Sequence, residues 1–443
     1  MRFFKPIFFQ TRLYFALFSI SGLFAFGYFL PIFFILAKVL LLLTSGLLIG
    51  DLLFLFAGKN SVECSRELPN RMSMSDANNV SLSVLNTYPF LVSVEIIDEL
   101  PFQFQKRDFQ INLYLKSDEG RTLTYVLIPK ERGEFEFGQT NIFVSTIIGF
   151  VKRRFKSNEK HIVPVYPSFI QMRKYELLAM SNRMDDAGVK KVKKAGKHTE
   201  FDQVREYVRG DDFKLMNWKA TAKRANLMVN QYQEERSKDV YSIIDMGRVM
   251  KMPFDGMSLL DYAINSSLAI SNISALKHDK AGLVTFSTQI NTFINAERRN
   301  NQMMRILEAL YNQKTDYLES NYELLYQTVK KRIRQRSLLI IYTNFESRVS
   351  LKRHIAPLQT LATSHLVLIV VFQNTEIDQM LYQPKESLED VYSSVIAEKF
   401  IYEKKLIVKE LNKSGVNAIL TTPQNLTVNL INKYLEFKAG EKI

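Results

Sequence analysis

The first 56 residues constrain the fold most, because they are almost entirely apolar while the rest of the 443-residue chain has the pattern of a soluble protein. Leu13 to Leu30 is an uncharged run of about the length that spans a bilayer. Pro31 interrupts it, and a second apolar run covers Ile32 to Phe56. A signal peptide has a shorter apolar core with a polar mature sequence after it. Residues 1–58 are therefore predicted to form a two-helix transmembrane hairpin, with spans at about 13–30 and 32–56.

The charges around these two runs predict their orientation. Cations flank both runs, whereas the tip between them carries no charge. The flanking cations are Arg2, Lys5, Arg12, Lys59 and Arg66. The positive-inside rule then places both termini and the soluble region in the cytoplasm, with the hairpin in the cytoplasmic (inner) membrane. The single cysteine, Cys64, excludes an intrachain disulfide and fits a reducing compartment.

Two charged residues, Lys38 and Asp51, lie within the second apolar run. We expect both to sit close to membrane interfaces, where a long side chain such as Lys38 reaches back toward the headgroups. A functional pair inside the membrane is the alternative.

Residues 61–167 have a β pattern. Val80 to Leu85 alternates apolar and polar side chains, and further short runs rich in β-branched or aromatic residues follow, separated by turn residues. These runs are 90–97, 109–115, 122–128 and 161–165. Several short strands at such spacing predict an antiparallel β-sandwich.

Residues 168–239 form a basic linking segment. A helix is predicted over Pro167 to Met180, and the polar stretch from Met184 to Lys197 is predicted to be an exposed loop. Lys and Arg outnumber Asp and Glu between Val151 and Val240, which accounts for most of the formal net charge of +14. A basic surface beside a bilayer indicates attraction to anionic headgroups or to an acidic partner. No nucleic-acid-binding motif accompanies the charge, so no nucleic acid is expected.

Residues 240–443 alternate continuous apolar strands with amphipathic helices. The predicted strands are 240–244, 282–286, 338–342, 366–372 and 417–421. The predicted helices are 259–276, 300–311, 322–333, 349–362, 388–411 and 424–435. This alternation predicts an α/β domain with a mostly parallel, doubly wound, Rossmann-like sheet.

A doubly wound sheet binds its ligand at the carboxyl ends of its strands, yet no nucleotide or catalytic motif lies there. No Gly-x-Gly-x-x-Gly follows the first strand, and the segment Ala195 to His198 lacks the first glycine and the Ser/Thr of a P-loop. Neither Gly-x-Ser-x-Gly nor His-Glu-x-x-His occurs. We therefore predict no enzyme activity, no catalytic residues, no cofactor and no bound nucleotide.

Asp245 ends the first strand of this sheet. In von Willebrand A domains that place carries Asp-x-Ser-x-Ser, whose oxygens help to hold a divalent ion. Here Gly247 and Val249 replace both hydroxyls, and Asn344 follows a later strand where that pattern has an Asp. A single carboxylate and a neutral amide make a poor cation site, so we predict no metal. A structural or ligand-bridging metal remains the alternative.

The most distinctive stretch runs from Glu200 to Arg236 and is called the signature below. It reads Glu-Phe-x-x-Val-Arg-Glu-Tyr-x-x-Gly-Asp-Asp, followed by Asn-Trp-Lys-Ala-Thr-Ala-Lys. Its candidate interaction residues are Glu200, Arg205, Tyr207, Gly210, Asp211, Asn217, Trp218 and Lys219. Upstream motifs at residues 66–69, 98–101 and 132–138 occur in the same order as in one family. Together these motifs resemble the family called domain of unknown function fifty-eight.

The resemblance implies a membrane-anchored protein with a von Willebrand A-like domain. Such proteins are commonly associated with AAA+ ATPases of the MoxR type and are thought to help assemble or mature other proteins. The expected function is a membrane-bound scaffold or interaction protein that binds protein partners without a metal. The alternative is a metal-dependent adhesion or ligand receptor that acts through the same domain.

The signature has two interpretations. In the structural one, Arg205, Arg209, Asp211 and Asp212 form an ion-pair and turn network that docks this segment on the α/β domain, with Trp218 as its buried apolar anchor. In the other, the signature is a recognition surface, because Arg and Trp are frequent hot spots at protein interfaces.

Overall fold

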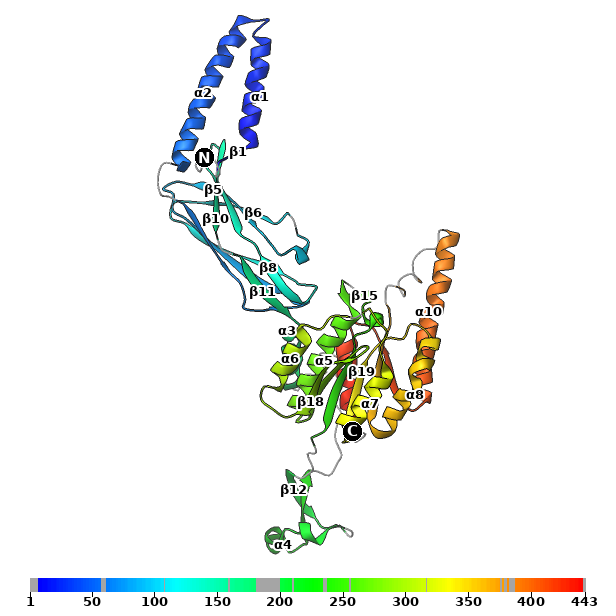
Figure 1. Ribbon diagram of the computed structural model, residues 1–443. Helices are drawn as coiled ribbons and strands as arrows, with labels where there is room; N and C mark the ends of the chain where they lie inside the picture. The colour runs from blue at the N-terminus through cyan, green and yellow to red at the C-terminus, as the bar shows by residue number, and fades with distance from the viewer. Residues whose placement is uncertain are drawn as a thin grey trace. The chain divides into compact units, whose positions relative to one another are not determined.

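The computed structural model describes residues 7–56, 61–106, 108–157, 160–180, 200–208, 211–233, 237–254, 256–315, 317–374, 377, 381 and 387–440. The chain is multi-domain and divides into two compact units, Met1–Tyr166 and Pro167–Ile443 (Figure 1). The loop predicted over 184–197 lies outside the described residues.

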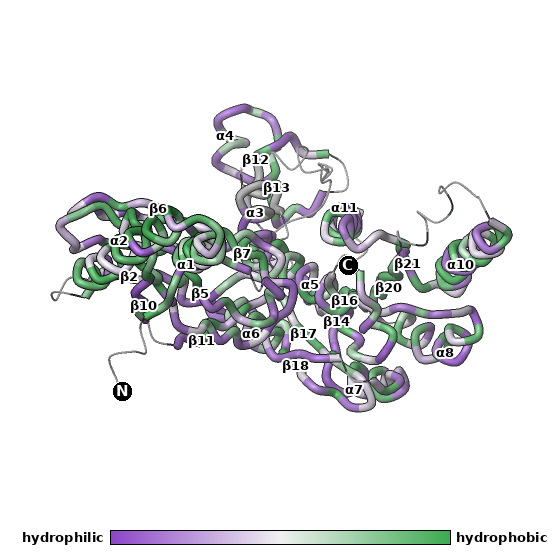
Figure 2. Tube along the Cα trace, turned by 90° about the horizontal axis from the view of Figure 1, so that it is seen from above, coloured by the Kyte–Doolittle hydropathy of each residue, from purple (hydrophilic) through white to green (hydrophobic). Residues whose placement is uncertain are grey.

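Two apolar helices, α1 (Thr11–Phe26) and α2 (Pro31–Phe56), occur near the start of the first unit. They pack against each other, with 5.7 Å between the ring centroids of Phe24 and Phe34. Gly27 allows the tight connection, because a Cβ there would lie 2.9 Å from the backbone nitrogen of Phe34. Among the described residues, only α2 is long and apolar enough to cross a membrane, and α1 is a shorter apolar helix. Figure 2 colours most of both helices hydrophobic, so the predicted apolar pair is confirmed, although the first helix ends at Phe26 rather than Leu30.

The segment before α1 corrects the assignment of residues 1–58 to the hairpin alone. Ile7–Phe9 forms strand β1, which pairs antiparallel with β10 (Val151–Ser157) in register Phe8↔Lys152. The chain therefore begins its described part as an edge strand of a sheet, leaves it for the two helices, and returns to the β domain.

The β domain has two antiparallel sheets that share one apolar core. Their strand orders are β1-β10-β9-β5-β6 and β2-β4-β7. The strands are β2 (Val62–Glu67), β4 (Asn78–Asn86), β5 (Val92–Asp98), β6 (Gln110–Leu115), β7 (Gly120–Leu127) and β9 (Thr140–Ser145). Alternate residues face the core, as Val92, Val94 and Ile96 do in β5. A third sheet, of β3 (Met72–Ser73), β11 (His161–Tyr166) and β8 (Gly133–Phe137), pairs β11 with β3 in parallel, so the predicted purely antiparallel sandwich was wrong there.

The upstream motifs meet in one buried network of this domain. Arg66 donates to Asp98 Oδ1 at 2.6 Å and to the carbonyl of Gly138 at 3.0 Å, with both charged side chains almost fully buried. Tyr125 and Thr140 also donate to Asp98. Burial and the Asp98 charge raise the pKa of Tyr125 above its ordinary value. The motif residues are thus explained by the internal architecture of the β domain.

Asp51 is buried against the β domain, and its expected position close to a membrane interface stays a prediction. Its carboxylate accepts hydrogen bonds from Thr146 Oγ1 at 2.5 Å and from the backbone N–H groups of Phe150 and Val151, both at 2.9 Å. Lys38 does not pair with it; its ammonium lies 4.4 Å from the Phe34 ring centroid. The last turns of α2 are therefore part of the β-domain core.

The second unit contains a six-stranded sheet of order β18-β17-β14-β19-β20-β21. The strands are β14 (Asp239–Asp245), β17 (Lys280–Phe286), β18 (Ile290–Glu297), β19 (Leu338–Tyr342), β20 (Leu366–Phe372) and β21 (Asn417–Thr421). All neighbours are parallel except the edge strand β18, which is antiparallel to β17. The inner strands are buried on both faces, which explains their continuous apolar sequences.

Helices cover both faces of this sheet (Figure 1). α5 (Leu259–Leu276) lies against β14 and β17 and contacts α3 (Phe169–Met180), α6 (Gln302–Tyr311) and α11 (Leu426–Ala439). α7 (Tyr322–Arg332), α8 (Arg348–Ser364) and α10 (Leu388–Lys413) share a second apolar core with the strands. The carboxyl ends of β14 and β19 lie next to each other at one edge of the sheet. The chain that follows β14 leads to α5 on one face, and the chain that follows β19 leads to α8 on the other face.

Candidate functional site

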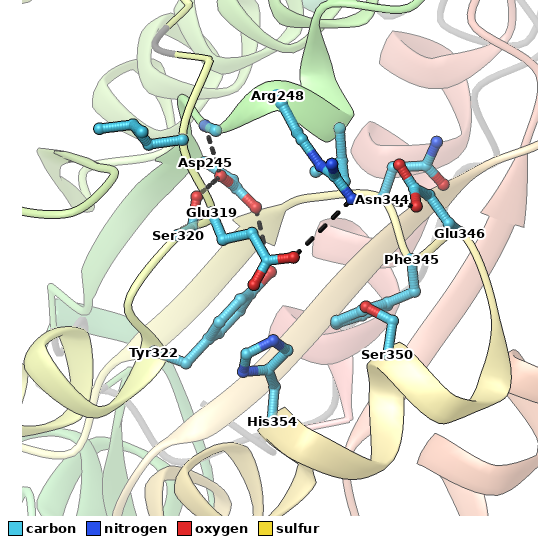
Figure 3. A pocket seen from close by; sticks show the side chains of 13 residues that line it. Asp245, Arg248, Glu319, Ser320, Tyr322, Asn344, Phe345, Glu346, Ser350 and His354 are labelled. Carbon is cyan, nitrogen blue, oxygen red and sulfur yellow. Dashed lines mark hydrogen bonds and ion pairs between the residues drawn. The ribbon is translucent and has the colours of Figure 1, made fainter.

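The carboxyl ends of β14 and β19 meet where the strand order reverses, which is the usual ligand position in a doubly wound sheet. Asp245 ends β14, and Thr343 and Asn344 directly follow β19. A small cavity of about 30 Å³ lies there, which exceeds the roughly 10–15 Å³ needed for one water. Figure 3 shows the side chains around it.

The Asp245 carboxylate is buried and surrounded by four hydrogen-bond donors. The Gly247 N–H donates at 2.8 Å and Thr343 Oγ1 at 2.7 Å, Tyr322 OH lies at 3.0 Å, and Ser320 Oγ also donates. Burial and the nearby Asp245 charge raise the pKa of the Tyr322 phenol well above its ordinary value. Hydroxyl groups from distant segments therefore surround Asp245, which the sequence around positions 245–249 did not indicate.

Gly247 makes room for one of these groups. A Cβ at this position would overlap with the Ser320 hydroxyl and lie 3.1 Å from both Asp245 Oδ1 and the Leu318 carbonyl. The Ser320 side chain thus takes the space that a side chain at position 247 would need. Val249 lines the cavity and offers no coordinating atom.

The positively charged side chain of Arg248 lies at the mouth of the cavity. The Arg248 guanidinium is 3.7 Å from a Glu319 carboxylate oxygen and 3.5 Å from one of Glu346, and all three side chains are more than half exposed. Figure 3 shows Arg248 between the two acids. Exposed pairs of this kind contribute little to stability, and the two acids outnumber the single cation.

Asn344 lies beside a second positively charged side chain, that of Lys404. Lys404 Nζ donates to Asn344 Oδ1 at 2.6 Å and also to the Phe345 carbonyl. The amide oxygen that would have to serve as a metal ligand is therefore already an acceptor for an ammonium group.

The chemistry of these groups does not indicate catalysis. His354 packs on the Tyr322 ring with 4.5 Å between centroids, and burial lowers its pKa. Among the described residues no hydrogen bond joins His354 to the hydroxyls of Ser320 or Ser350, and no group of three or more His, Cys, Asp or Glu side chains is placed to hold a metal. The absence of a metal and of enzyme activity stays a prediction.

The signature forms a small module of its own. Strands β12 (Glu200–Glu206) and β13 (Met228–Gln233) pair antiparallel, and a short 3₁₀ turn (Phe213–Leu215) and helix α4 (Trp218–Arg224) lie between them. We call β12, β13 and the described residues between them the signature hairpin. Gly210 and Arg209 lie outside the described residues, as does the side chain of Glu200.

The polar signature residues hold this hairpin together. Arg205 makes a two-pronged ion pair with Asp211, at 2.8 and 2.7 Å, and Asp211 also accepts the Val208 N–H at 2.9 Å. Asn217 caps α4 by accepting the Ala220 N–H at 2.9 Å. This part of the structural interpretation agrees with the geometry.

The apolar signature residues instead favour the interpretation as a recognition surface, because their side chains are exposed. Trp218 is 67% exposed, Phe213 68% and Val208 63%. Tyr207 packs against Phe213, with 5.5 Å between ring centroids, and Lys219 is exposed on α4. The interpretation of Trp218 as a buried anchor was therefore wrong.

Sequence reasoning missed Ser320, Tyr322, Thr343 and Lys404. Thr343 could have been predicted as a site residue from the sequence, because it directly follows a buried strand. Ser320 and Tyr322 flank the Asn321 cap of α7 and resemble any helix start, and Lys404 is one of two adjacent lysines in a long helix. Only the tertiary fold brings them to the edge of the sheet.

One curated relative matches part of the chain. The uncharacterized protein YeaD of Bacillus subtilis (strain 168) is 27% identical over 126 residues, which cover 28% of this chain and 31% of that protein. The match thus spans less than a third of the relative's length.

Two solved structures are similar to about a quarter of the chain. They are the CARDB domain of a Pyrococcus furiosus protein (13% identity, 25% of this chain and 94% of that chain, TM-score 0.18) and a PapD-like domain of human CEP192 (11%, 24% and 86%, TM-score 0.19). These TM-scores are too low to assign a shared fold. The family comparison is more specific: residues 203–386 match the family described as protein of unknown function DUF58, the family that the signature resembles.

Proposed function

We propose that this protein is a membrane-anchored interaction protein that binds a protein partner through the signature hairpin. One observation carries the proposal: the polar signature residues bond within the hairpin, while Val208, Phe213 and Trp218 stay exposed. Exposed aromatic clusters are costly to keep in water and mark interaction sites. Trp and Arg are also the side chains that most often dominate binding energy.

Membrane anchoring rests on the apolar helix pair. Most residues of α2 are exposed, including Leu42 and Phe54, which favours a lipid environment. Its last turns are integral to the β domain, since Asp51 and Leu55 are buried there. Removal as a signal peptide would leave the donors to Asp51 unpaired, so we propose that the helices are retained as a two-pass anchor.

The partner is proposed from the family resemblance to be an AAA+ ATPase of the MoxR type. The order and direction of the six strands support a von Willebrand A-like domain beside the signature hairpin. Lys404 supports binding without a metal, because its ammonium already occupies the Asn344 amide oxygen.

Co-expression of the full chain with a MoxR-type ATPase from the same organism tests this proposal. Trp218→Ala and Phe213→Ala should each weaken copurification from detergent-solubilised membranes by about tenfold or more, as loss of an interface hot spot does. The melting temperature should stay unchanged, because both side chains are exposed.

Tyr114→Ala is the matched control, because Tyr114 is an aromatic residue of the β domain that is also 67% exposed. It should leave copurification intact. The proposal fails if the ATPase does not copurify with the parent, or if it binds the Trp218 and Phe213 variants as well as the parent.

A metal-dependent receptor is the second candidate. The observation in its favour is that Ser320 and Thr343 place hydroxyl oxygens on Asp245. Its requirement for a divalent ion distinguishes it from the leading proposal.

A further inference from the structure

A second cavity lies at the same edge of the sheet, beside the ends of β19 and β20. Its volume is about 220 Å³. Most of its wall is apolar and comes from Phe254, Leu259, Phe372, Phe400 and Ile401. The polar groups that face it are Asn344, Glu346, Gln373, Asn374 and Lys404.

Lys404 is a largely buried cation with neutral partners. Its ammonium donates to the Asn344 amide oxygen and to the Phe345 carbonyl. Among the described residues no carboxylate lies within ion-pair distance of it, and Glu346 and Glu403 act on it only from farther away. Burial is the main influence and lowers the pKa of Lys404 to about 8, so the group is still mostly protonated at neutral pH. A buried charge without a counter-ion is unfavourable.

We propose that this cavity binds the carboxyl-terminal residue of a protein partner, with an apolar side chain between the cavity walls and the terminal carboxylate on Lys404. The carboxylate supplies a counter-ion that no described residue gives to Lys404. The volume is below the roughly 300–1,000 Å³ of cofactor or drug-sized sites and suits one apolar side chain. Gln373 and Asn374 also line the cavity and give its rim a polar part.

This site lies apart from the signature hairpin and does not depend on it. Isothermal titration of the full chain in detergent, with chelator present, tests it with acetyl-Gly-Gly-Leu as the probe. We expect saturable binding that weakens at least tenfold for the carboxyl-terminal amide of the same peptide. Affinity should also fall from pH 7 to pH 10 as Lys404 loses its proton; the other charged groups that act on Lys404 are Glu346 and Glu403.

Two variants identify the cation. Lys404→Met should abolish binding, whereas Lys405→Met, which removes the exposed neighbouring lysine of α10, should leave it unchanged. Asn344→Asp keeps the shape of the side chain and puts an internal carboxylate 2.6 Å from Lys404, so it should also abolish binding. This variant keeps the test decisive if Lys404→Met does not fold.

Several results would overturn the inference. Equal affinity for the acid and the amide would exclude carboxylate recognition, and so would retained binding in both Lys404→Met and Asn344→Asp. Binding of N-acetyl-leucine as tightly as the tripeptide would assign the site to a small apolar acid instead of a chain terminus. Failure of the parent to bind any apolar carboxyl-terminal residue, tried as Leu, Ile, Met or Phe, would exclude the site.

Discussion

Asp245 is the residue at which the two candidate functions differ. Its oxygens are held by hydroxyl and amide donors, and a divalent ion would have to displace donor protons to reach them. Mg²⁺ also needs near-octahedral oxygen ligands and gives up its water reluctantly. Lys404 also occupies the amide oxygen of Asn344, which is the second oxygen that the metal site would need.

We predict that Mg²⁺ does not stabilise the full chain. An ion that bound only the folded state would raise the melting temperature as its concentration rose. The melting temperature should therefore be the same in chelator and in millimolar Mg²⁺, and partner binding should survive chelation. Saturable stabilisation by Mg²⁺ or Mn²⁺ that disappears in Asp245→Ala would instead favour the metal-dependent receptor.

Gly247 gives a second test at this scale. Gly247→Ser restores the hydroxyl position of the von Willebrand A pattern but overlaps with Ser320. We predict a loss of about 1–3 kcal/mol in the free energy of unfolding, as overpacking a buried site causes. Denaturant unfolding of Gly247→Ser, Ser320→Gly and the double variant measures the coupling between the two positions.

The double variant should recover part of the loss, because the hydroxymethyl group introduced at position 247 then has the space that the Ser320 side chain vacates. Strictly additive effects would show that the two side chains do not compete.

At the scale of elements, continuous apolar strands and clearly alternating strands were predictable, whereas edge strands and strongly charged strands were not. The inner strands β14, β19 and β20 lie within a residue of their predicted bounds, because burial on both faces leaves an unbroken apolar run. β18 and β10 were missed: β18 is a half-exposed edge strand, and β10 reads Val-Lys-Arg-Arg-Phe-Lys-Ser. Half-buried strands with long charged side chains have no clear sequence pattern.

The candidate site was predictable only where it followed strand ends. Asp245 and Asn344 were placed correctly at the edge of the sheet. Ser320 and Lys404 come from a loop and from the middle of α10, and nothing local in the sequence marks their approach. The exposure of Trp218 was missed because an isolated tryptophan is more often buried than exposed.

The junction between α2 and the β domain provides a prediction about an element. Asp51→Ala removes the acceptor for two backbone N–H groups and for Thr146, leaving buried donors unpaired. We predict a loss of about 2–4 kcal/mol of local stability. Hydrogen–deuterium exchange of the amides in β9 and β10, measured on the full chain in detergent, should be correspondingly faster.

Thr44→Ala is the control from the same helix, because the Thr44 hydroxyl bonds only to the Leu41 carbonyl at an exposed position. It should leave exchange in β9 and β10 unchanged. Unchanged exchange in Asp51→Ala as well would mean that α2 is not part of the stable β domain.

At the scale of the whole molecule, charge around the helix pair supports one orientation. Arg12 begins α1 near the β domain, and Arg153 of β10 donates to the Leu55 carbonyl and lies 4.8 Å from the Phe56 ring centroid. Arg154 lies 5.2 Å from the Phe8 ring centroid. Cations therefore gather at the base of the hairpin, where anionic headgroups of the cytoplasmic leaflet would attract them. Arg66, in contrast, is paired with Asp98 inside the β domain and contributes nothing to this surface.

This distribution gives a prediction about topology. The positive-inside rule assigns the cationic base to the cytoplasm and the uncharged tip between α1 and α2 to the other side. A phosphatase that is active only outside the cytoplasm should therefore be silent when fused after Ile443 and active when inserted at the tip, after Tyr28. A fluorescent protein that matures in the cytoplasm should give the reverse pattern. Phosphatase activity at Ile443 would place the signature hairpin on the outer side, where a cytoplasmic ATPase has no access, and would rule out the proposed partner.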